Sequence, residues 1–330
     1  MVGIIILNYN NIIDIKLCVN SLLEKNDMAQ LKLLIIENGS TSDNYEEVRS
    51  FLINKVGIIS NIEEYELNQI NELSKYSILR LTKNYGYAKG NNYGINMMIR
   101  DTSINHIMIL NNDIIFTENL IEPLLHYVYE IPITKLGVVS PLLLDSNGNI
   151  DYCCARKAYS RNLLTFSFSY LFEPLYVYFR EKYNILKSFP EYRKLKYIEV
   201  DLTSGSCMLF RKEVLQYIGG FDEHTFLYYE ENILNKKMNK HGYVNYMIPS
   251  LSCIYVGGQT TNKLDNRYFL LKCNYDSLLY YMRYYEHSGF LRLLYIKFTG
   301  KFRLFRVKTM TKLRNYLKNT YVIFYCCTSL

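Results

Sequence analysis

Short apolar runs alternate with amphipathic stretches over the first 140 residues of the chain. Runs rich in β-branched residues predict strands at Gly3–Leu7, Leu31–Ile36, Ser77–Leu81, His106–Leu110 and Gly137–Ser140. Between the first two runs, the apolar residues Ile15, Cys18, Val19, Leu22 and Leu23 recur at helical spacing. This alternation is typical of βαβ units, so we predict an α/β fold with a mainly parallel sheet.

Polar residues directly follow four of the predicted strands. They are Asn8-Tyr9-Asn10, Glu37-Asn38-Gly39-Ser40, the segment from Asn84 onward, and Asn111-Asn112-Asp113. In an open α/β sheet, the carboxyl ends of the strands line the ligand crevice. We therefore expect these four clusters to converge on one binding site.

The rest of the chain departs from this rhythm. Residues 151–198 are rich in Tyr, Phe, Arg and Lys, which predicts an inserted cover over the site or a partner surface. A second ordered block follows from Thr203 to about Tyr246. We expect one large domain over residues 1–262 and a basic, aromatic-rich helical tail over residues 263–330.

Charge is concentrated in that tail. From residue 287 to the end there are nine basic residues and no acidic one, and removing these nine from the formal net charge of +7 leaves about −2 for residues 1–286. Apolar residues lie among the bases, namely Phe290, Leu291, Leu293, Leu294, Ile296 and Phe298. The pattern of residues 288–330 suits a membrane interface beside anionic lipid, and a helical hairpin packed on the body is the alternative. Nucleic acid is not an expected partner, because no recognised module accompanies the charge.

The composition and the amino-terminal sequence limit the class of protein and its expected location. Hydrophobic residues make up 49% of the 330 residues, which is enough for a full core. The eight cysteines include no C-x-x-C pair and are typical of free thiols in a reducing compartment. The first apolar run ends at Asn8 and predicts a strand, not a signal peptide. No segment approaches the roughly 20 apolar residues of a spanning helix. We expect a protein in the cytoplasm, either free or peripheral on the inner face of the plasma membrane.

Three segments carry candidate chemistry. The first is N-Y-G-Y-A-K-G-N-N-Y-G at Asn84–Gly94, which follows a strand and leads into an apolar helix at Ile95–Ile99. Glycines let the backbone approach a nucleotide, and a helix N-terminus favours anions. The segment is neither a Walker A loop nor a G-x-G-x-x-G fingerprint. A tight turn is an equal alternative.

The second segment is I-M-I-L-N-N-D-I-I-F, in which Asp113 follows a hydrophobic strand. One carboxylate together with a substrate diphosphate is a usual way to hold Mg²⁺ or Mn²⁺. Asn and Asp also favour turns, so an ordinary turn is the alternative.

The third segment contains the adjacent carboxylates Glu230 and Glu231 beside aromatic residues. Desolvation and like charge would raise the pKa of one of them, as a general base near neutrality requires. The alternative is that both are first-turn helix residues favoured by the helix dipole.

In order and spacing, six segments make the chain resemble glycosyltransferase family 2, the inverting enzymes of GT-A fold, and particularly its rhamnosyl- and galactofuranosyltransferase branch. They are I-I-I-L-N-Y-N, I-I-E-N-G-S, N-Y-G-Y-A-K-G-N-N-Y-G, L-N-N-D, G-S-C-M-L-F-R and G-G-F-D-E-H-T-F-L-Y-Y-E-E. The resemblance covers roughly residues 1–261. It implies a Rossmann-like, mainly parallel sheet flanked by helices, a nucleoside-diphosphate-sugar donor (a UDP- or dTDP-sugar) and a divalent cation, Mn²⁺ or Mg²⁺.

The resemblance also implies site residues. Those on the nucleotide side are Asn8, Asn10, Glu37, Asn38, Asn84, Gly86, Gly90, Asn92, Asn112 and Asp113, and Asp113 also holds the metal. Those on the substrate side are Gly205, Ser206, Tyr228, Tyr229 and Glu230. The family signature E-D-x-D-L becomes Glu230-Glu231-Asn232-Ile233-Leu234, which places Glu231 at the position of the catalytic base.

The chain departs from the family pattern in four places. The base is Glu instead of Asp, and Ile233 replaces the second carboxylate of the signature. Tyr255 stands where the family often has a histidine suited to the metal, and Asp43 lies one residue later than expected. The metal site would then rest on Asp113, diphosphate and water.

These features predict transfer of a sugar, with inversion, from the donor to a hydroxyl of an oligosaccharide or lipid-linked glycan, in cell-surface polysaccharide synthesis. A nucleotidyltransferase is an alternative that would be expected to show a basic triphosphate loop near the amino terminus, and N-Y-N-N-I-I-D offers none. An inactive glycan- or nucleotide-binding homologue is the other alternative, and Ile233 and Tyr255 are the residues that favour it.

Overall fold

The computed structural model describes residues 1–131, 136–188, 191–257 and 267–327. The strands are β1 (Val2–Asn8), β2 (Leu31–Asn38), β3 (Ser60–Glu63), β4 (Tyr76–Leu81), β5 (His106–Asn111), β6 (Ile114–Ile115), β7 (Leu136–Leu144), β8 (Ile198–Val200), β9 (Cys207–Arg211) and β10 (Val244–Tyr255). The α-helices are α1 (Ile12–Lys25), α2 (Ser42–Val56), α3 (Gly86–Arg100), α4 (Ile121–Glu130), α5 (Arg161–Thr165), α6 (Glu173–Glu181), α7 (Ile185–Ser188), α8 (Lys212–Ile218), α9 (Glu230–Lys240), α10 (Arg267–Tyr284) and α11 (Phe290–Cys327).

One sheet of ten strands organises the molecule. Its order is β3-β4-β2-β1-β5-β9-β7-β10-β6, and β8 pairs with β10 outside this path. Strands β3, β4, β2, β1 and β5 are parallel, whereas β9 runs antiparallel to both of its neighbours, β5 and β7. All five predicted strands are present, and the mainly parallel sheet is confirmed. The reversed strand β9 lies in G-S-C-M-L-F-R, a segment that had been identified only as a motif.

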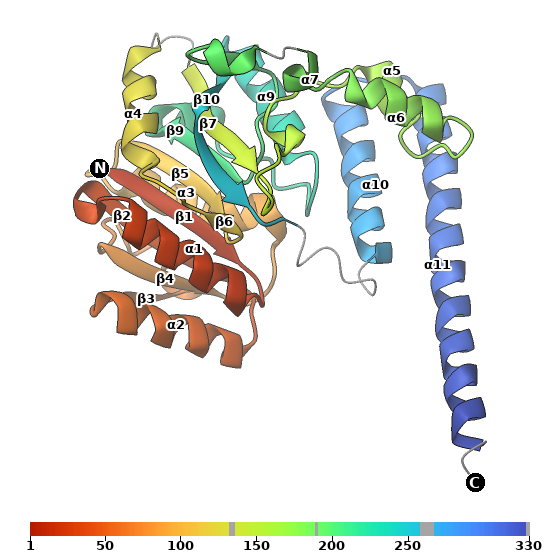
Figure 1. Ribbon diagram of the computed structural model, residues 1–330, viewed down its shortest axis with the longest axis horizontal. Coiled ribbons are helices and arrows are strands. Elements are labelled where there is room, and N and C mark those ends of the chain that lie inside the picture. Colours follow the sequence, from red (N-terminus) through yellow and green to blue (C-terminus); the bar gives the residue numbers. More distant parts are fainter. Residues whose placement is uncertain (132–135, 189–190, 258–266, 328–330) are drawn as a thin grey trace.

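Helices cover both faces of the sheet, and each face has its own apolar core (Figure 1). Along β1, Ile4 and Ile6 pack with Ile15 of α1, whereas the intervening Ile5 packs on the opposite face with Ile95 of α3. Successive strand side chains alternate between faces, and both faces are buried here. This explains why the central strands read as continuous hydrophobic runs and not as alternating ones.

The inserted segment and the tail form a third cluster beside the sheet. Phe168 from the insert, Ile233 from α9, and Leu278, Tyr281 and Ile296 from α10 and α11 share this apolar cluster. The first part of α11 packs on α10, and the helix then continues well past α10 (Figure 1). The inner face of the tail therefore packs as the hairpin alternative predicted. The expected boundary at residues 262 and 263 lies outside the described residues.

Candidate active site

The polar strand ends meet at one edge of the sheet. Asn8 is level with Glu37 across β1 and β2, and Leu7 is level with Asn111 across β1 and β5. The Asn8 Nδ2 donates to Glu37 Oε1 at 2.8 Å, and the Asn112 Nδ2 donates to Asn8 Oδ1 at 2.6 Å. The predicted convergence of the strand ends is thus present as a chain of side-chain hydrogen bonds.

Glu37 is the buried carboxyl of this edge. Its side chain is fully enclosed, and burial raises its pKa, against the opposing effect of hydrogen bonds from Ser40 and Asn8. Hydrogen bonds from Asn8 and Ser40 fix the direction of the Glu37 carboxyl group, and its Oε2 is buried without a hydrogen-bond partner among the described residues. It can therefore act as an acceptor for a ligand that enters from the edge of the sheet.

Asn10 joins the loops that follow β1 and β2. It adopts the left-handed conformation with φ of 49°, which asparagine tolerates better than most residues. Its backbone N–H donates to Ser40 Oγ at 3.0 Å, and its Oδ1 accepts from Thr41 N–H at 2.9 Å. Asn10 therefore fixes the rim of the site, and its side-chain oxygen is already occupied by the hydrogen bond from Thr41.

Asn38 connects the second strand end with the glycine-rich segment. Its Nδ2 donates to Asn84 Oδ1 and to the Gly86 carbonyl, both at 3.1 Å, and its Oδ1 accepts from Tyr85 N–H at 3.0 Å. Gly86 has φ of +82°, and a β-carbon there would overlap the Phe226 carbonyl. The glycine therefore allows the start of α3 to approach the segment that leads to α9.

Two residues predicted on the nucleotide side, Gly90 and Asn92, make packing and hydrogen-bond contacts within the protein. A β-carbon on Gly90 would lie 2.8 Å from Leu7 Cδ1, so Gly90 is a close-packing position between α3 and β1. Asn92 is buried, donates to the Phe221 carbonyl at 2.9 Å and accepts from Phe221 N–H at 2.9 Å. The helix begins at Gly86 and not at Ile95, and positions 90 and 92 then fall on packed faces of α3.

Glu231 reaches the strand-end region through Gly205. The Gly205 N–H donates to Glu231 Oε1 at 3.1 Å, and the Tyr87 hydroxyl donates to the Gly205 carbonyl at 2.6 Å. A β-carbon at position 205 would come within 3.0 Å of Glu231 Oε1 and 3.1 Å of the Tyr87 hydroxyl. A side chain at position 205 would therefore require these two neighbours to shift by a few tenths of an ångström. Ser206, the next residue, accepts from Asn111 N–H through its carbonyl at 2.9 Å, which ties Glu231 to the end of β5.

Glu230 differs from its neighbour in burial. It is 6% exposed, and burial first, then the charge of Glu231, raise its pKa to about 8. The expectation that one member of the pair has a raised pKa is confirmed, and that member is Glu230. Both residues also occupy the first turn of α9, so the helix-start interpretation is correct as well. Glu231 is the more accessible carboxyl of the two.

The two tyrosines before the pair have an unusual backbone. Tyr228 and Tyr229 have φ of 73° and 70°, a region that costs bulky side chains roughly 1–3 kcal/mol each. The Tyr229 ring packs 5.5 Å from that of Tyr281 in α10, between ring centroids, within the third apolar cluster. The Tyr229 side chain therefore supports the start of α9 from the tail side, and its acceptor-side role stays a prediction.

Asp113 lies beside Tyr255 at the opposite wall. The Val256 N–H donates to the Asp113 carbonyl at 3.0 Å, and Tyr255 pairs with Ile114 across β10 and β6. Burial raises the pKa of Asp113 to about 6, and its Oδ1 is buried without a hydrogen-bond partner among the described residues. Burial first, then the charge of Asp113, raise the pKa of Tyr255, while a hydrogen bond from Ser206 opposes this.

The residues around Asp113 allow one mode of metal binding. Among the residues that the structure describes, no group of three or more His, Cys, Asp or Glu side chains could enclose an ion. An unpartnered carboxylate oxygen nevertheless suits Mg²⁺ or Mn²⁺ held by one protein ligand, with phosphate and water completing the shell. Asp113 would supply that ligand.

Arg156, from the inserted segment, is a site residue that the sequence motifs did not indicate. Its backbone N–H donates to the Leu202 carbonyl at 3.0 Å, and its Nε donates to the Cys153 carbonyl at 3.1 Å. Burial alone would lower the pKa of Arg156, but the Glu231 carboxylate contributes most to raising it. A guanidinium thus lies in the field of the candidate base. In the sequence, Arg156 is only a basic residue after C-C-A, with no recognisable motif around it.

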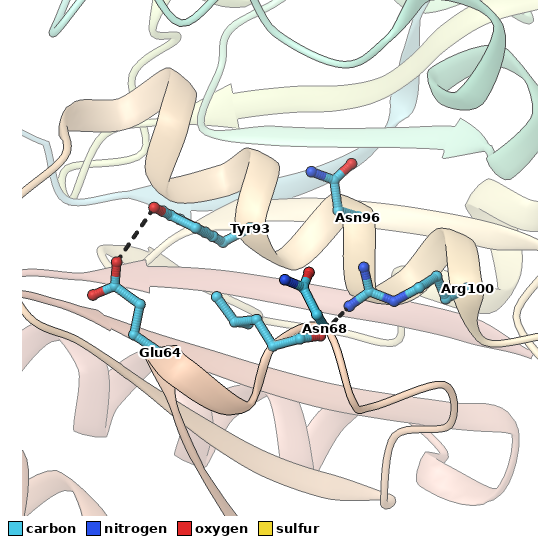
Figure 2. A pocket seen from close by; sticks show the side chains of 6 residues that line it. Glu64, Asn68, Tyr93, Asn96 and Arg100 are labelled. Carbon is cyan, nitrogen blue, oxygen red and sulfur yellow. Dashed lines mark hydrogen bonds between the residues drawn. The ribbon is translucent and has the colours of Figure 1, made fainter.

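A hollow lies on the outer side of α3. Its volume is about 270 Å³, and Glu64, Leu67, Asn68, Tyr93, Asn96 and Arg100 line it (Figure 2). Glu64 accepts from Thr82 and Tyr85, and Arg100 donates to the carbonyls of Leu67 and Ile70. The charged groups of its wall are thus paired within the protein, and the hollow is separate from the strand-end site.

The described helices include none with a stretch long and apolar enough to cross a membrane. The cysteines Cys18, Cys153, Cys154, Cys207, Cys253 and Cys273 are free thiols, as the spacing predicts.

Comparison with known proteins agrees with this geometry. Residues 3–134 match the model of the family described as "Glycosyl transferase family 2". Two curated relatives from Mycobacterium tuberculosis, of strains CDC 1551 / Oshkosh and ATCC 25618 / H37Rv, are 25% identical over 159 residues. Each is named N-acetylglucosaminyl-diphospho-decaprenol L-rhamnosyltransferase, and the match spans 48% of this chain and 48% of each relative.

Two solved structures share the fold. GalNAc-T7 with UDP, GalNAc and Mn²⁺ aligns with a TM-score of 0.53 at 12% identity, over 77% of this chain and 43% of its own. The mannosyltransferase PcManGT from Pyrobaculum calidifontis, in complex with GDP-Man and Mn²⁺, aligns with a TM-score of 0.50 at 14% identity, over 93% of this chain and 73% of its own. The chain therefore has a GT-A fold with a helical C-terminal region, its residues 3–134 match glycosyl transferase family 2, and it resembles the rhamnosyltransferase branch of that family.

Proposed function

We propose that this glycosyltransferase moves a sugar, with inversion, from a UDP- or dTDP-sugar to a hydroxyl of an oligosaccharide or lipid-linked glycan. The observation that carries the proposal is the link from Glu231 through Gly205 and Ser206 to the ends of the central strands. It brings an accessible carboxylate to the crevice where an α/β sheet binds its ligand.

On the donor side, Glu37 would accept a hydrogen bond from the nucleoside, within the frame that Asn8, Asn38 and Asn112 hold rigid. Asp113 would hold a divalent cation through its unpartnered Oδ1. Such a cation, when bound, offsets the negative charge that builds on the leaving diphosphate.

On the acceptor side, Glu231 would take the proton from the acceptor hydroxyl as that oxygen attacks the anomeric carbon. Attack from the face opposite the diphosphate inverts the anomeric centre. The Gly205 N–H fixes one carboxylate oxygen, which leaves the other to face the acceptor. Glu230 keeps its proton at neutral pH because its pKa is about 8, so the pair does not hold two adjacent negative charges.

The acceptor class is suggested by the curated relatives, whose name includes a decaprenol-linked diphosphate. A lipid-linked acceptor would place the enzyme at the inner face of the plasma membrane, in synthesis of a cell-surface polysaccharide. This assignment is a proposal for the present chain, since the match spans about half of each relative.

A donor panel tests the proposal. Purified protein is incubated with UDP-, dTDP- and GDP-sugars, with and without Mn²⁺, and release of nucleoside diphosphate is measured with and without a polyprenyl-diphosphate-linked sugar acceptor. Acceptor-dependent release from one donor is the expected result. Release of pyrophosphate from a nucleoside triphosphate would indicate a nucleotidyltransferase. Tight donor binding without any turnover would indicate the inactive homologue.

A further inference from the structure

One face of α11 carries an exposed apolar stripe. It consists of Leu291, Leu294, Phe298, Phe302 and Phe305. Successive members are three, four, four and three residues apart, so they share one face of the helix. Leu291, Phe298 and Phe305 are 78%, 72% and 67% exposed. Side chains of this size on one face are too many to be the scattered apolar residues of an ordinary surface.

The stripe is distinct from the face by which α11 packs on the protein. Ile296 and Leu304 point inward and belong to the apolar cluster shared with α10 and the insert. Arg303, on the inner side, pairs with Glu173 of α6 at 2.8 Å. The helix is therefore anchored through one face and presents a second apolar face outward.

The apolar surface continues from α11 onto the insert. The Phe302 ring lies 6.2 Å from that of Tyr170, between centroids, and the next residue, Leu171, is 81% exposed. The insert also supplies Arg156 near Glu231. The insert thus places a positive charge in the field of Glu231 and also carries part of the exposed apolar surface.

Cations flank the stripe. Lys297, Lys301 and Lys308 are exposed, and at 100° per residue they fall along one edge of it. The sequence from residue 287 to the end contains no acidic residue. A second copy of α11 laid against this stripe would bring lysines toward lysines with no carboxylate from the helix to pair with them, which opposes a coiled-coil dimer. A surface of negative charge above an apolar layer complements both features.

We propose that the stripe on α11 and the adjoining insert surface form a docking face for an anionic lipid bilayer. The helix lies in the plane of the interface, with Leu291, Phe298 and Phe305 at the acyl boundary and the lysines at the headgroups. Docking presents the acceptor side of the insert to the membrane. The binding itself does not depend on the proposed sugar transfer.

Vesicle flotation of the full chain, without donor, tests the docking face. We expect the protein to float with vesicles of phosphatidylcholine and phosphatidylglycerol, to bind vesicles of phosphatidylcholine alone weakly, and to be released as salt rises. The combined change Lys297→Gln, Lys301→Gln and Lys308→Gln should lower the partition coefficient on the anionic vesicles by about a hundredfold.

The matched pair of variants isolates the stripe. Leu291→Ser, Phe298→Ser and Phe305→Ser together should abolish flotation, whereas Ile58→Ser, which changes a residue 90% exposed after α2, should leave it unchanged. Circular dichroism and nucleoside diphosphate release verify that the variants are folded. Equal binding by the stripe variant, or no flotation of the wild type, overturns the proposal. A lipid-free dimer in sedimentation that the stripe variant loses would show that a second copy covers the face.

Discussion

The two halves of the candidate site are built in different ways. The proposed donor half is made of side chains that follow β1, β2 and β5 and bond mainly to one another, as in the chain from Asn112 through Asn8 to Glu37. The acceptor half draws on α9, the turn before β9 and the insert, and depends on a strained Tyr228-Tyr229 backbone held by α10. A parallel sheet brings its own strand ends together, whereas the acceptor half exists only after distant segments have packed.

This contrast bears on how the two halves tolerate change. Asp222 accepts hydrogen bonds from Tyr280 and Tyr285 of the tail. Burial would raise the pKa of Asp222, but hydrogen bonds from Tyr285, His224 and Tyr280 lower it. The segment that precedes the glutamate pair is thus attached to α10. If the strand ends bind the donor as proposed, changes in the acceptor half should reduce turnover while donor binding persists.

The largest effect is expected for Glu231→Gln. Losing a general base costs roughly 10²- to 10⁴-fold in turnover, so we expect kcat to fall about a thousandfold or more. Calorimetric affinity for the nucleoside diphosphate should change by less than about twofold, because no strand-end group is altered. Near-normal turnover would show that another residue is the base. Glu24→Gln, at an exposed site on α1, is the control for loss of a carboxylate.

The second-largest fall in turnover is expected for Gly205→Ala. The new β-carbon would lie 3.0 Å from Glu231 Oε1, so the carboxylate would have to shift by a few tenths of an ångström, and we expect kcat to fall by about tenfold. Gly289→Ala is the matched control, since a β-carbon there meets nothing within 4 Å. If Gly205→Ala retained full kcat, the contact between Gly205 and Glu231 would not position the base.

Arg156→Gln should reduce kcat by about tenfold, because the variant removes a positive charge from the field of Glu231. The readout is the split between kcat and nucleotide affinity, together with partial recovery in Arg156→Lys. Lys157→Gln, an exposed neighbour, should have little effect. An equal loss of nucleotide affinity would instead place Arg156 on the donor diphosphate and weaken the distinction between the halves.

The smallest effect is expected for Glu230→Gln, and it concerns the stability of the fold and its dependence on pH. Burial raises the pKa of Glu230 from 4.5 to about 8, so its protonated form contributes stability that is complete below pH 4.5 and lost as pH rises through about 8. Glu230→Gln mimics the protonated form and should raise the melting temperature by roughly 5 °C at pH 9, with little change at pH 5. The same increase at both pH values would mean that the charge of Glu230 is not responsible.

Several parts of the site could be predicted from the sequence because they follow from local periodicity. Asn8, Glu37, Asn38 and Asn112 come directly after apolar runs, and the ends of adjacent parallel strands must meet. The packed positions of Gly90 and Asn92 could not be predicted, because the sequence predicts a helix that starts at Ile95. Once it begins at Gly86, its period of 3.6 residues turns those positions toward β1 and Phe221.

The sequence by itself determined five strands of the sheet, the residues that follow them and the presence of two adjacent carboxylates, since these depend only on neighbouring residues. The tertiary structure decided which carboxylate is buried, which one Gly205 holds, and that Arg156 reaches the same site. It also decided which face of α11 packs and which stays exposed. Burial and approach depend on segments more than a hundred residues apart in some cases, as between Tyr87 and Gly205, and no local pattern encodes that distance.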